Sequence, residues 1–274
     1  DGKFTRDYIF VQDVCKSRLF DLLIHDWDRH DDQWRWASFK EGDQTIYRPI
    51  PRDRDQVYSK YDGALFGVLR YTIPFLKQLR KYDPKIPADK IKWVNYHSRH
   101  FDRTFMTEGS WEEWEKAANY IKNNVTDDII EAAIKKWPSN VYAIDGEETI
   151  KVLKQRRDDM LEYAKGLYGY LAQKVDVLGT DKKDYFLVQR LDAERTKVMV
   201  FDTNKEVDKI KAILYSRIFK TSETKEISLK LSDTGKMGIA YKNPFDVFGF
   251  NNEETVSSDQ EYSNPFDKFG FILV

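Results

Sequence analysis

"HDWDRHDDQWRW", residues 25–36, is the most informative stretch of this chain for both fold and function. Asp26, Asp28, His30, Asp31 and Asp32 follow one another closely, directly after an apolar segment. Like charges at such spacing repel, so the crowding costs stability unless positive charge lies among them. A metal ion or a substrate commonly supplies that charge, so the stretch is the first candidate for a functional site.

The flanking segments predict a helix before the cluster and a hairpin after it. Residues 7–24 carry apolar side chains at a spacing of 3.6, which is typical of an amphipathic helix. Residues 33–55, "QWRWASFKEGDQTIYRPIPRDRD", predict two short strands that turn at 41–43. The charged cluster is therefore expected in a loop between a helix end and a hairpin.

The remaining chain predicts an α+β fold, in which a helix-rich domain is followed by a small antiparallel β module. Helical patterns dominate residues 64–174, and strand-like segments such as "DYFLVQRL" and "TKVMVF" follow. We expect domains at 1–175 and 176–242, and an extended tail at 243–274. The tail repeats "NPFDVFGF" (243–250) as "NPFDKFGF" (264–271), which indicates either two turn-plus-strand pieces or an aromatic segment that docks on a partner.

Composition excludes some functional classes. The 45 basic and 46 acidic residues give a net charge of −1 without a basic stripe, which argues against nucleic-acid binding. The single Cys15 cannot form an internal disulfide and is expected to pack in the first helix. No apolar run reaches the length of about 18 residues that a transmembrane helix requires.

The order of side chains after residue 24 matches the needs of phosphoryl transfer. That reaction uses a carboxylate to orient the attacking hydroxyl and further oxygen ligands to hold Mg²⁺ against phosphates. Asp28 follows the predicted helix, Gln33 comes five residues later, and Asp53 and Asp55 close the predicted hairpin. The sequence therefore predicts that these side chains converge.

"DWDRHDDQW" and "YRPIPRDRD" together resemble the Asp-Arg-His loop and the Asp metal motif of atypical kinases, such as the spore-coat protein H and Fam-type kinases. The resemblance implies a kinase C-lobe-like fold and Mg²⁺ with ATP as cofactor. It also implies Asp28 as the catalytic base, Gln33 at the Asn metal position, and Asp53 or Asp55 as the principal Mg²⁺ ligand. Beside these, His30 is expected to assist catalysis, and Arg29 and Arg52 to contact phosphate, which guanidinium groups suit. Gln33 departs from the usual Asn and is one methylene longer.

A longer resemblance covers most of the chain. "RLFDLLIHDWDRHDDQWRW", "YRPIPRDRDQVYSKYDG" and "VNYHSRHFDRTFMT" look like the middle region of large Bacteroidota envelope proteins. Those proteins pair a calcineurin-like metallophosphoesterase with a surface-antigen-type outer-membrane barrel. The resemblance implies a periplasmic-side segment of a larger outer-membrane protein, whose partners are the other domains of that protein and a possible outer-membrane complex.

Kinase activity is not expected from this chain alone. A kinase needs a Gly-rich loop and a strand lysine ahead of the catalytic loop, and only 27 residues precede Asp28. The abrupt start, "DGKFTRDY", is interpreted as the interior of a longer protein. A regulatory, pseudokinase-like role is therefore expected, and any turnover would be Mg-dependent phosphoryl transfer.

Other interpretations stay open. Arg29 and Arg35 could pair with the carboxylates in a purely structural ion network. His25 and His30 could join the aspartates in a Zn²⁺ or Mn²⁺ site. "HSRHFDR" (97–103) predicts either surface histidines or a phosphate-contacting loop. The alternative function is that of a non-catalytic assembly module in an envelope complex, and the alternative location is the cytoplasm.

Overall fold

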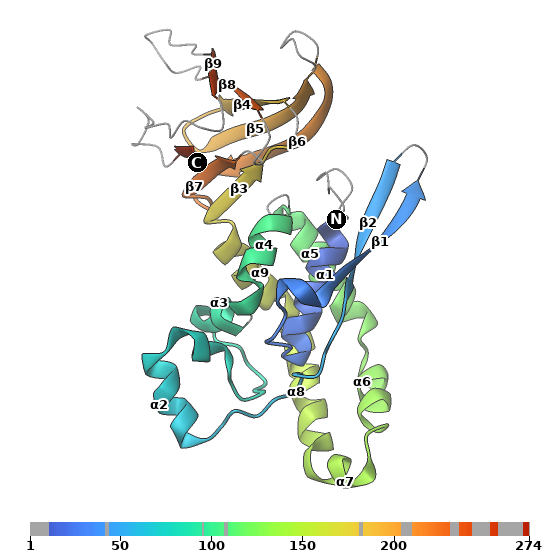
Figure 1. Ribbon diagram of the computed structural model, residues 1–274. Helices are drawn as coiled ribbons and strands as arrows, with labels where there is room; N and C mark the ends of the chain where they lie inside the picture. The colour runs from blue at the N-terminus through green and yellow to red at the C-terminus, as the bar shows by residue number, and fades with distance from the viewer. Residues whose placement is uncertain are drawn as a thin grey trace. The chain divides into compact units, whose positions relative to one another are not determined.

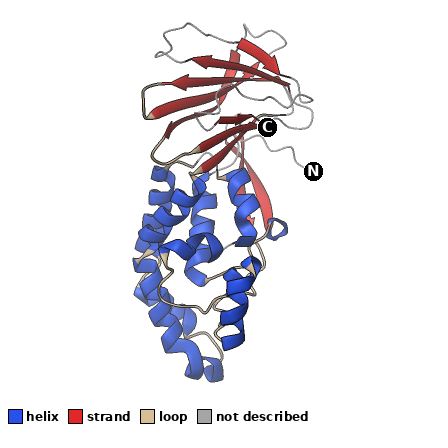
Figure 2. Ribbon diagram, turned by 90° about the vertical axis from the view of Figure 1, so that its left-hand side faces the viewer, coloured by secondary structure: helices blue, strands red, loops and turns tan. Residues whose placement is uncertain are grey.

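The computed structural model divides the chain into two compact units, which separate between Tyr170 and Leu171. Helices make up most of the first unit and strands most of the second (Figure 2). This composition confirms the α+β class, while the kinase-like character of the first unit and the separate tail domain stay predictions. The structure describes residues 11–41, 44–94, 96–106, 109–180, 183–203, 210–230, 236–242, 253–256 and 271–273.

The first helix, α1 (Val11–Ile24), forms as its apolar spacing predicts. It packs against α5 (Trp111–Asn124), and the two lie together in the helical unit (Figure 1). Their shared core contains fully buried apolar side chains: Val14, Cys15, Leu19, Leu22, Trp114 and Ala117. Burying each of the larger ones contributes about 1.5–3 kcal/mol, so α1 is firmly anchored and its C-terminal end is well placed.

The predicted hairpin follows as β1 (Trp34–Glu41) and β2 (Gln44–Pro51). The strands pair antiparallel from Trp34 opposite Pro51 to Glu41 opposite Gln44. Trp34 lies at the base of the hairpin, buried and stacked on Phe101 with a 4.1 Å centroid separation. This contact fixes the hairpin base against α4 (Arg99–Phe105).

Besides α1 and α5, the described part of the helical unit contains seven α-helical segments with their connecting turns, α4 among them. They are α2 (Ala64–Thr72), α3 (Ile91–Val94), α4, α6 (Asp127–Ile134), α7 (Ser139–Val141), α8 (Glu147–Asp158) and α9 (Met160–Leu171). Their regularity bears out the helical periodicity of residues 64–174. No helix in the described parts of the chain is long and apolar enough to cross a membrane.

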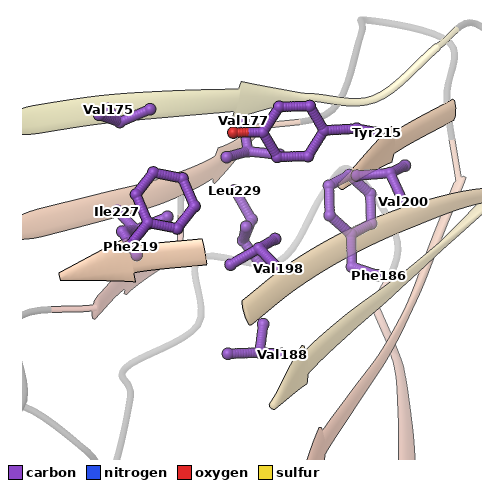
Figure 3. Packing of buried hydrophobic residues seen from close by; sticks show 10 residues of the cluster. All are labelled: Val175, Val177, Phe186, Val188, Val198, Val200, Tyr215, Phe219, Ile227 and Leu229. Carbon is purple, nitrogen blue, oxygen red and sulfur yellow. The ribbon is translucent and has the colours of Figure 1, made fainter. Parts of the chain in front are cut away.

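The described strands of the second unit form two sheets. Its larger sheet has the order β6-β5-β4-β8-β9 and its smaller one the order β10-β7-β3. The strands are β3 (Lys174–Leu178), β4 (Lys183–Arg190), β5 (Arg195–Thr203), β6 (Ile210–Lys220), β7 (Glu226–Lys230), β8 (Lys236–Lys242), β9 (Glu253–Val256) and β10 (Phe271–Leu273). Buried valines and aromatic rings from both sheets, among them Val177, Phe186 and Val198, form its core (Figure 3).

Strand pairing in this unit is more varied than an antiparallel module. β4, β5 and β6 form the expected antiparallel meander, but β3 pairs parallel with β7 and β4 parallel with β8. Parallel neighbours need a long crossover, and the β4–β6 meander supplies it between β3 and β7. The repeated Asn-Pro-Phe-Asp segments lie outside the described residues, except for Phe271 at the start of β10.

Candidate functional site

The charged cluster lies where α1 ends, as predicted. The helix stops because His25 adopts a left-handed backbone with φ 60°, which turns the chain away from the helix axis. Asp26 N–H donates to Asp21 O at 2.8 Å and closes the turn. His30 N–H then donates to Asp28 O at 2.9 Å, which bends the loop toward β1.

Two arginines of the first segment neutralise the most buried carboxylates. Arg18 is fully buried and pairs with Asp21 at 2.8 Å and with Asp102 of α4 at 2.6 Å. Arg29 is also fully buried, donates to Asp26, and lies 3.3 Å from Asp21. The positive charge that the crowded aspartates require is therefore supplied in part by the chain itself.

A third arginine comes from the segment after the hairpin. Arg54 lies 2.9 Å from Asp21 and 3.8 Å from Asp26, with its guanidinium carbon 5.0 Å from the centroid of the Phe20 ring. Asp21 thus receives three guanidinium groups and lies at the centre of a buried network. Removing one member of such a network leaves buried charge uncompensated, which is costly.

Burial raises the pKa of one loop residue, Asp26, and lowers the pKa of its neighbour, His25. Desolvation, helped by the nearby Asp21 carboxylate, raises the pKa of Asp26 to about 6. Desolvation and the nearby Arg156 lower the pKa of His25 to about 3. His25 is therefore neutral near pH 7, and its Nε2–H donates to Arg80 O at 3.2 Å.

Asp28, the predicted catalytic base, projects from this buried network and is partly exposed. Its Oδ1 accepts a hydrogen bond from Nδ1 of His97 at 2.6 Å. His97 Nε2 in turn lies 3.0 Å from Nε2 of Gln78, which is fully buried. Because Gln78 engages Nε2, Nδ1 of His97 carries the proton directed at Asp28. The orientation of the Asp28 carboxylate is thus set by a buried amide through one imidazole.

The segment that carries Asp53 is tied to the Asp28 loop by backbone contacts. Arg52 N–H donates to Gln33 O at 2.8 Å, and the guanidinium of Arg29 donates to Arg52 O. Asp53 follows directly with a left-handed φ of 53°, and its side chain is exposed. The residue after Asp28 and the residue before Asp53 are therefore in direct contact.

The predicted metal ligands differ in their surroundings. Gln33 is buried, and its Oε1 has no hydrogen-bond partner among the described residues. Asp53 and Asp55 are exposed, whereas His30 is half-buried. Within the described ranges, no three His, Cys, Asp or Glu side chains lie close enough to hold a metal ion.

The oxygen donors of this set suit Mg²⁺ or Mn²⁺ better than Zn²⁺. Mg²⁺ is commonly held by one or two carboxylates together with phosphate oxygens and water, so a three-residue cage is not required. Gln33 Oε1, buried without a hydrogen-bond partner among the described residues, is the kind of oxygen donor that such a site uses, and the backbone O of the same residue bonds to Arg52 N–H. His25, the alternative ligand for a transition metal, instead donates Nε2–H to Arg80 O, away from the aspartates.

Sequence reasoning missed several members of the site. Arg18 and Asp21 lie on α1, on the same face as the buried Leu22. The apolar pattern of the helix did not identify them as buried charges. Two charged residues three apart on an apolar helix face would have indicated a buried pair. Asp102 lies in the stretch 97–103 quoted above, but its pairing with Arg18 follows only from the tertiary fold. Gln78 carries no local signal at all, because only the tertiary fold brings it to the loop.

A scan against protein-family models, a search of curated proteins and a search of solved structures each found no match to this chain.

Proposed function

We propose that residues 25–55 form the metal- and phosphate-binding part of a kinase-like domain. Asp28 would act as the catalytic base, with His30 nearby in the loop. Gln33, Asp53 and Asp55 would hold Mg²⁺, and the exposed Arg52 would contact the phosphates of ATP. Arg29, expected at the phosphates from the sequence, is instead fully buried among Asp21, Asp26 and Arg52 O and would hold the loop in place. We further propose that the domain is a periplasmic-side segment of a larger outer-membrane protein, where it serves a regulatory or pseudokinase role.

One observation carries the proposal. The contact between Arg29 and Arg52, together with the Arg52–Gln33 backbone bond, holds the Asp28 loop and the Asp53 segment against each other. Those two segments were singled out because they resemble the catalytic loop and the metal motif of atypical kinases. Their proximity across the hairpin supports a kinase-like site, because it would place the catalytic base and the metal-binding side chains around one bound nucleotide.

The chemistry of the proposed site follows from its neighbours. When bound, Mg²⁺ would screen the phosphate charges and orient the transferred group. Asp28 is held by His97 with one carboxylate oxygen, which leaves its second oxygen to accept a proton from an incoming hydroxyl. The buried Arg29 fixes the loop backbone through Asp26 and Arg52, so that Asp28 is held in place before a ligand arrives.

Binding of Mg–ATP is expected to raise the melting temperature, and Asp53→Ala is expected to abolish that rise. At a ligand concentration tenfold above Kd, binding adds about 1.4 kcal/mol, which corresponds to about 3–5 °C for a chain of this size. Differential scanning fluorimetry with Mg–ATP, ATP without metal and Mg²⁺ alone measures this effect.

Asp32→Ala is the matched control for that experiment, because Asp32 is an exposed carboxylate of the same loop outside the proposed ligand set. It should keep the full Mg–ATP response. An equal loss of response in the Asp32 and Asp53 variants would contradict a specific site. The absence of any Mg–ATP response in the unsubstituted chain would contradict the proposal as a whole.

A second candidate function, an assembly module of an envelope complex, is favoured by α2. Three large apolar side chains of this helix are mostly exposed: Leu65 at 69%, Val68 at 66% and Tyr71 at 92%. Contiguous exposed apolar surface commonly marks an interaction site. Val68→Glu should then reduce co-purification of the full-length protein with envelope proteins, while leaving the Mg–ATP response unchanged.

A further inference from the structure

Cations and aromatic rings gather on the part of the helical unit that contains α3 and α4. The group consists of Lys77 from the turn Pro74–Gln78, Lys92 and Trp93 from α3, Tyr96 from the turn Tyr96–Ser98, and Arg99 from α4. We call these five residues the basic–aromatic cluster. None of them is among the seven residues expected at the kinase-like site, although Arg99 lies in the stretch 97–103 for which a phosphate-contacting loop was one expectation.

The cations of this cluster lie over the faces of its rings. Nζ of Lys77 is 4.5 Å from the centroid of the Trp93 ring, and Nζ of Lys92 is 5.4 Å from it. Trp93 and Tyr96 have centroids 5.5 Å apart, and the guanidinium carbon of Arg99 is 4.2 Å from the Tyr96 ring. Three positive charges are therefore gathered around two neighbouring rings.

Carboxylates do not neutralise these cations within the described part of the chain. Lys77, Lys92 and Arg99 form no ion pair there, and Arg99 makes only a backbone bond to Tyr96 O at 3.1 Å. Lys90, by contrast, pairs with Asp89 at 2.6 Å.

We propose that the basic–aromatic cluster binds a phosphate group. Lysine supplies point charges and arginine a planar pair of donors, and both suit phosphate oxygens. An anion beside Lys77, Lys92 and Arg99 would meet three cations that no carboxylate of the described residues pairs with. The proposal goes beyond the Asp28 site and does not depend on it, because none of these cations belongs to residues 25–55.

The same chemistry has two sources, a free phosphorylated molecule and the headgroup of an anionic lipid. Isothermal titration with inorganic pyrophosphate tests the first source. Co-sedimentation with phosphatidylcholine vesicles, with and without phosphatidylglycerol, tests the second. Binding of pyrophosphate, or of vesicles only when they contain phosphatidylglycerol, supports the phosphate site and identifies its source. Phosphatidylcholine vesicles are the control, because they present a headgroup phosphate without a net negative charge.

Lys92→Glu and Arg99→Glu are each expected to lower the affinity for the bound probe by about tenfold or more, because each removes a charge-assisted contact. Lys90→Glu makes the same charge change two residues from Lys92, but at a lysine already paired with Asp89, and should change affinity no more than about twofold. Unchanged melting temperatures in these variants establish that folding is intact.

Two results would overturn the proposal: no binding of either probe by the unsubstituted chain, or equal affinities in the Lys90, Lys92 and Arg99 variants. Asp53→Ala separates this proposal from the kinase-like one. It should leave pyrophosphate and vesicle binding unchanged even where it removes the response to Mg–ATP, so that either proposal can fail alone.

Discussion

Asp21→Asn should lower the free energy of unfolding by about 3–5 kcal/mol, the cost of breaking a buried ion network from one side. Asp21 is fully buried and faces Arg18, Arg29 and Arg54 at 2.8–3.3 Å. Asparagine keeps the shape but removes the charge that these guanidinium groups share. Urea unfolding at pH 7, followed by circular dichroism, measures the difference.

Asp13→Asn is the matched control on the same helix. Asp13 is partly exposed and pairs with Lys16 at 2.7 Å and with Arg48 at 2.9 Å. Exposed pairs contribute about 0–1 kcal/mol, so this variant should stay close to the unsubstituted chain. Equal effects of the two substitutions would show that the Asp21 network is no more stabilising than a surface pair.

His25→Asn should make the protein less sensitive to acid. The pKa of His25 is about 3 in the folded chain and 6.5 as the reference for the unfolded one, so the unfolded chain binds the extra proton between these values. Its contribution to stability is complete above pH 6.5 and falls by about 3 kcal/mol on acidification to pH 4. Asparagine tolerates the left-handed backbone and does not titrate.

Asp26 is expected to act in the opposite direction. Its pKa is about 6 in the folded chain against 3.8 for the reference, so protonation between these values favours the folded state. Acidification from pH 7 to pH 4 therefore adds about 2 kcal/mol through this group. In the unsubstituted chain the two neighbours largely cancel, and removing either one reveals the other.

Urea unfolding of the parent chain, His25→Asn and Asp26→Asn at pH 4, 5, 6 and 7 tests both signs. Relative to the parent, the His25 variant should gain stability toward pH 4 and the Asp26 variant toward pH 7. Comparing each variant with the parent at the same pH removes the contribution of all other titrating groups, because the proteins share them. Parallel curves for all three proteins would show that neither group changes its pKa on folding.

Local pattern was sufficient for the elements that carry the candidate site. Apolar spacing placed α1, the Trp-rich strands placed the hairpin, and their order placed the charged loop between them. It also indicated the α+β class through the change from helical to strand periodicity near residue 175. Such features depend on neighbours within a few residues, and those neighbours are visible in the sequence.

The partners of the loop were not visible in this way. Asp28 was identified from its spacing, but its hydrogen bond to His97 joins residues 69 positions apart. The pairing of Arg18 with Asp102 spans 84 positions. Pairs so far apart in the sequence produce no periodic pattern, and charge alone does not show which of the many arginines and aspartates will form a pair.

The sequence by itself determined that a helix, a charged loop and a hairpin follow one another, and that Asp28, Gln33 and Asp53 lie on that unit. The tertiary structure decided which charges are functional candidates and which are structural. Burial places Asp21 and Asp26 among arginines, whereas Asp28 is partly exposed and Asp53 exposed. The physical reason is desolvation, because a carboxylate removed from water requires a partner within the fold, whereas an exposed one stays able to bind a ligand.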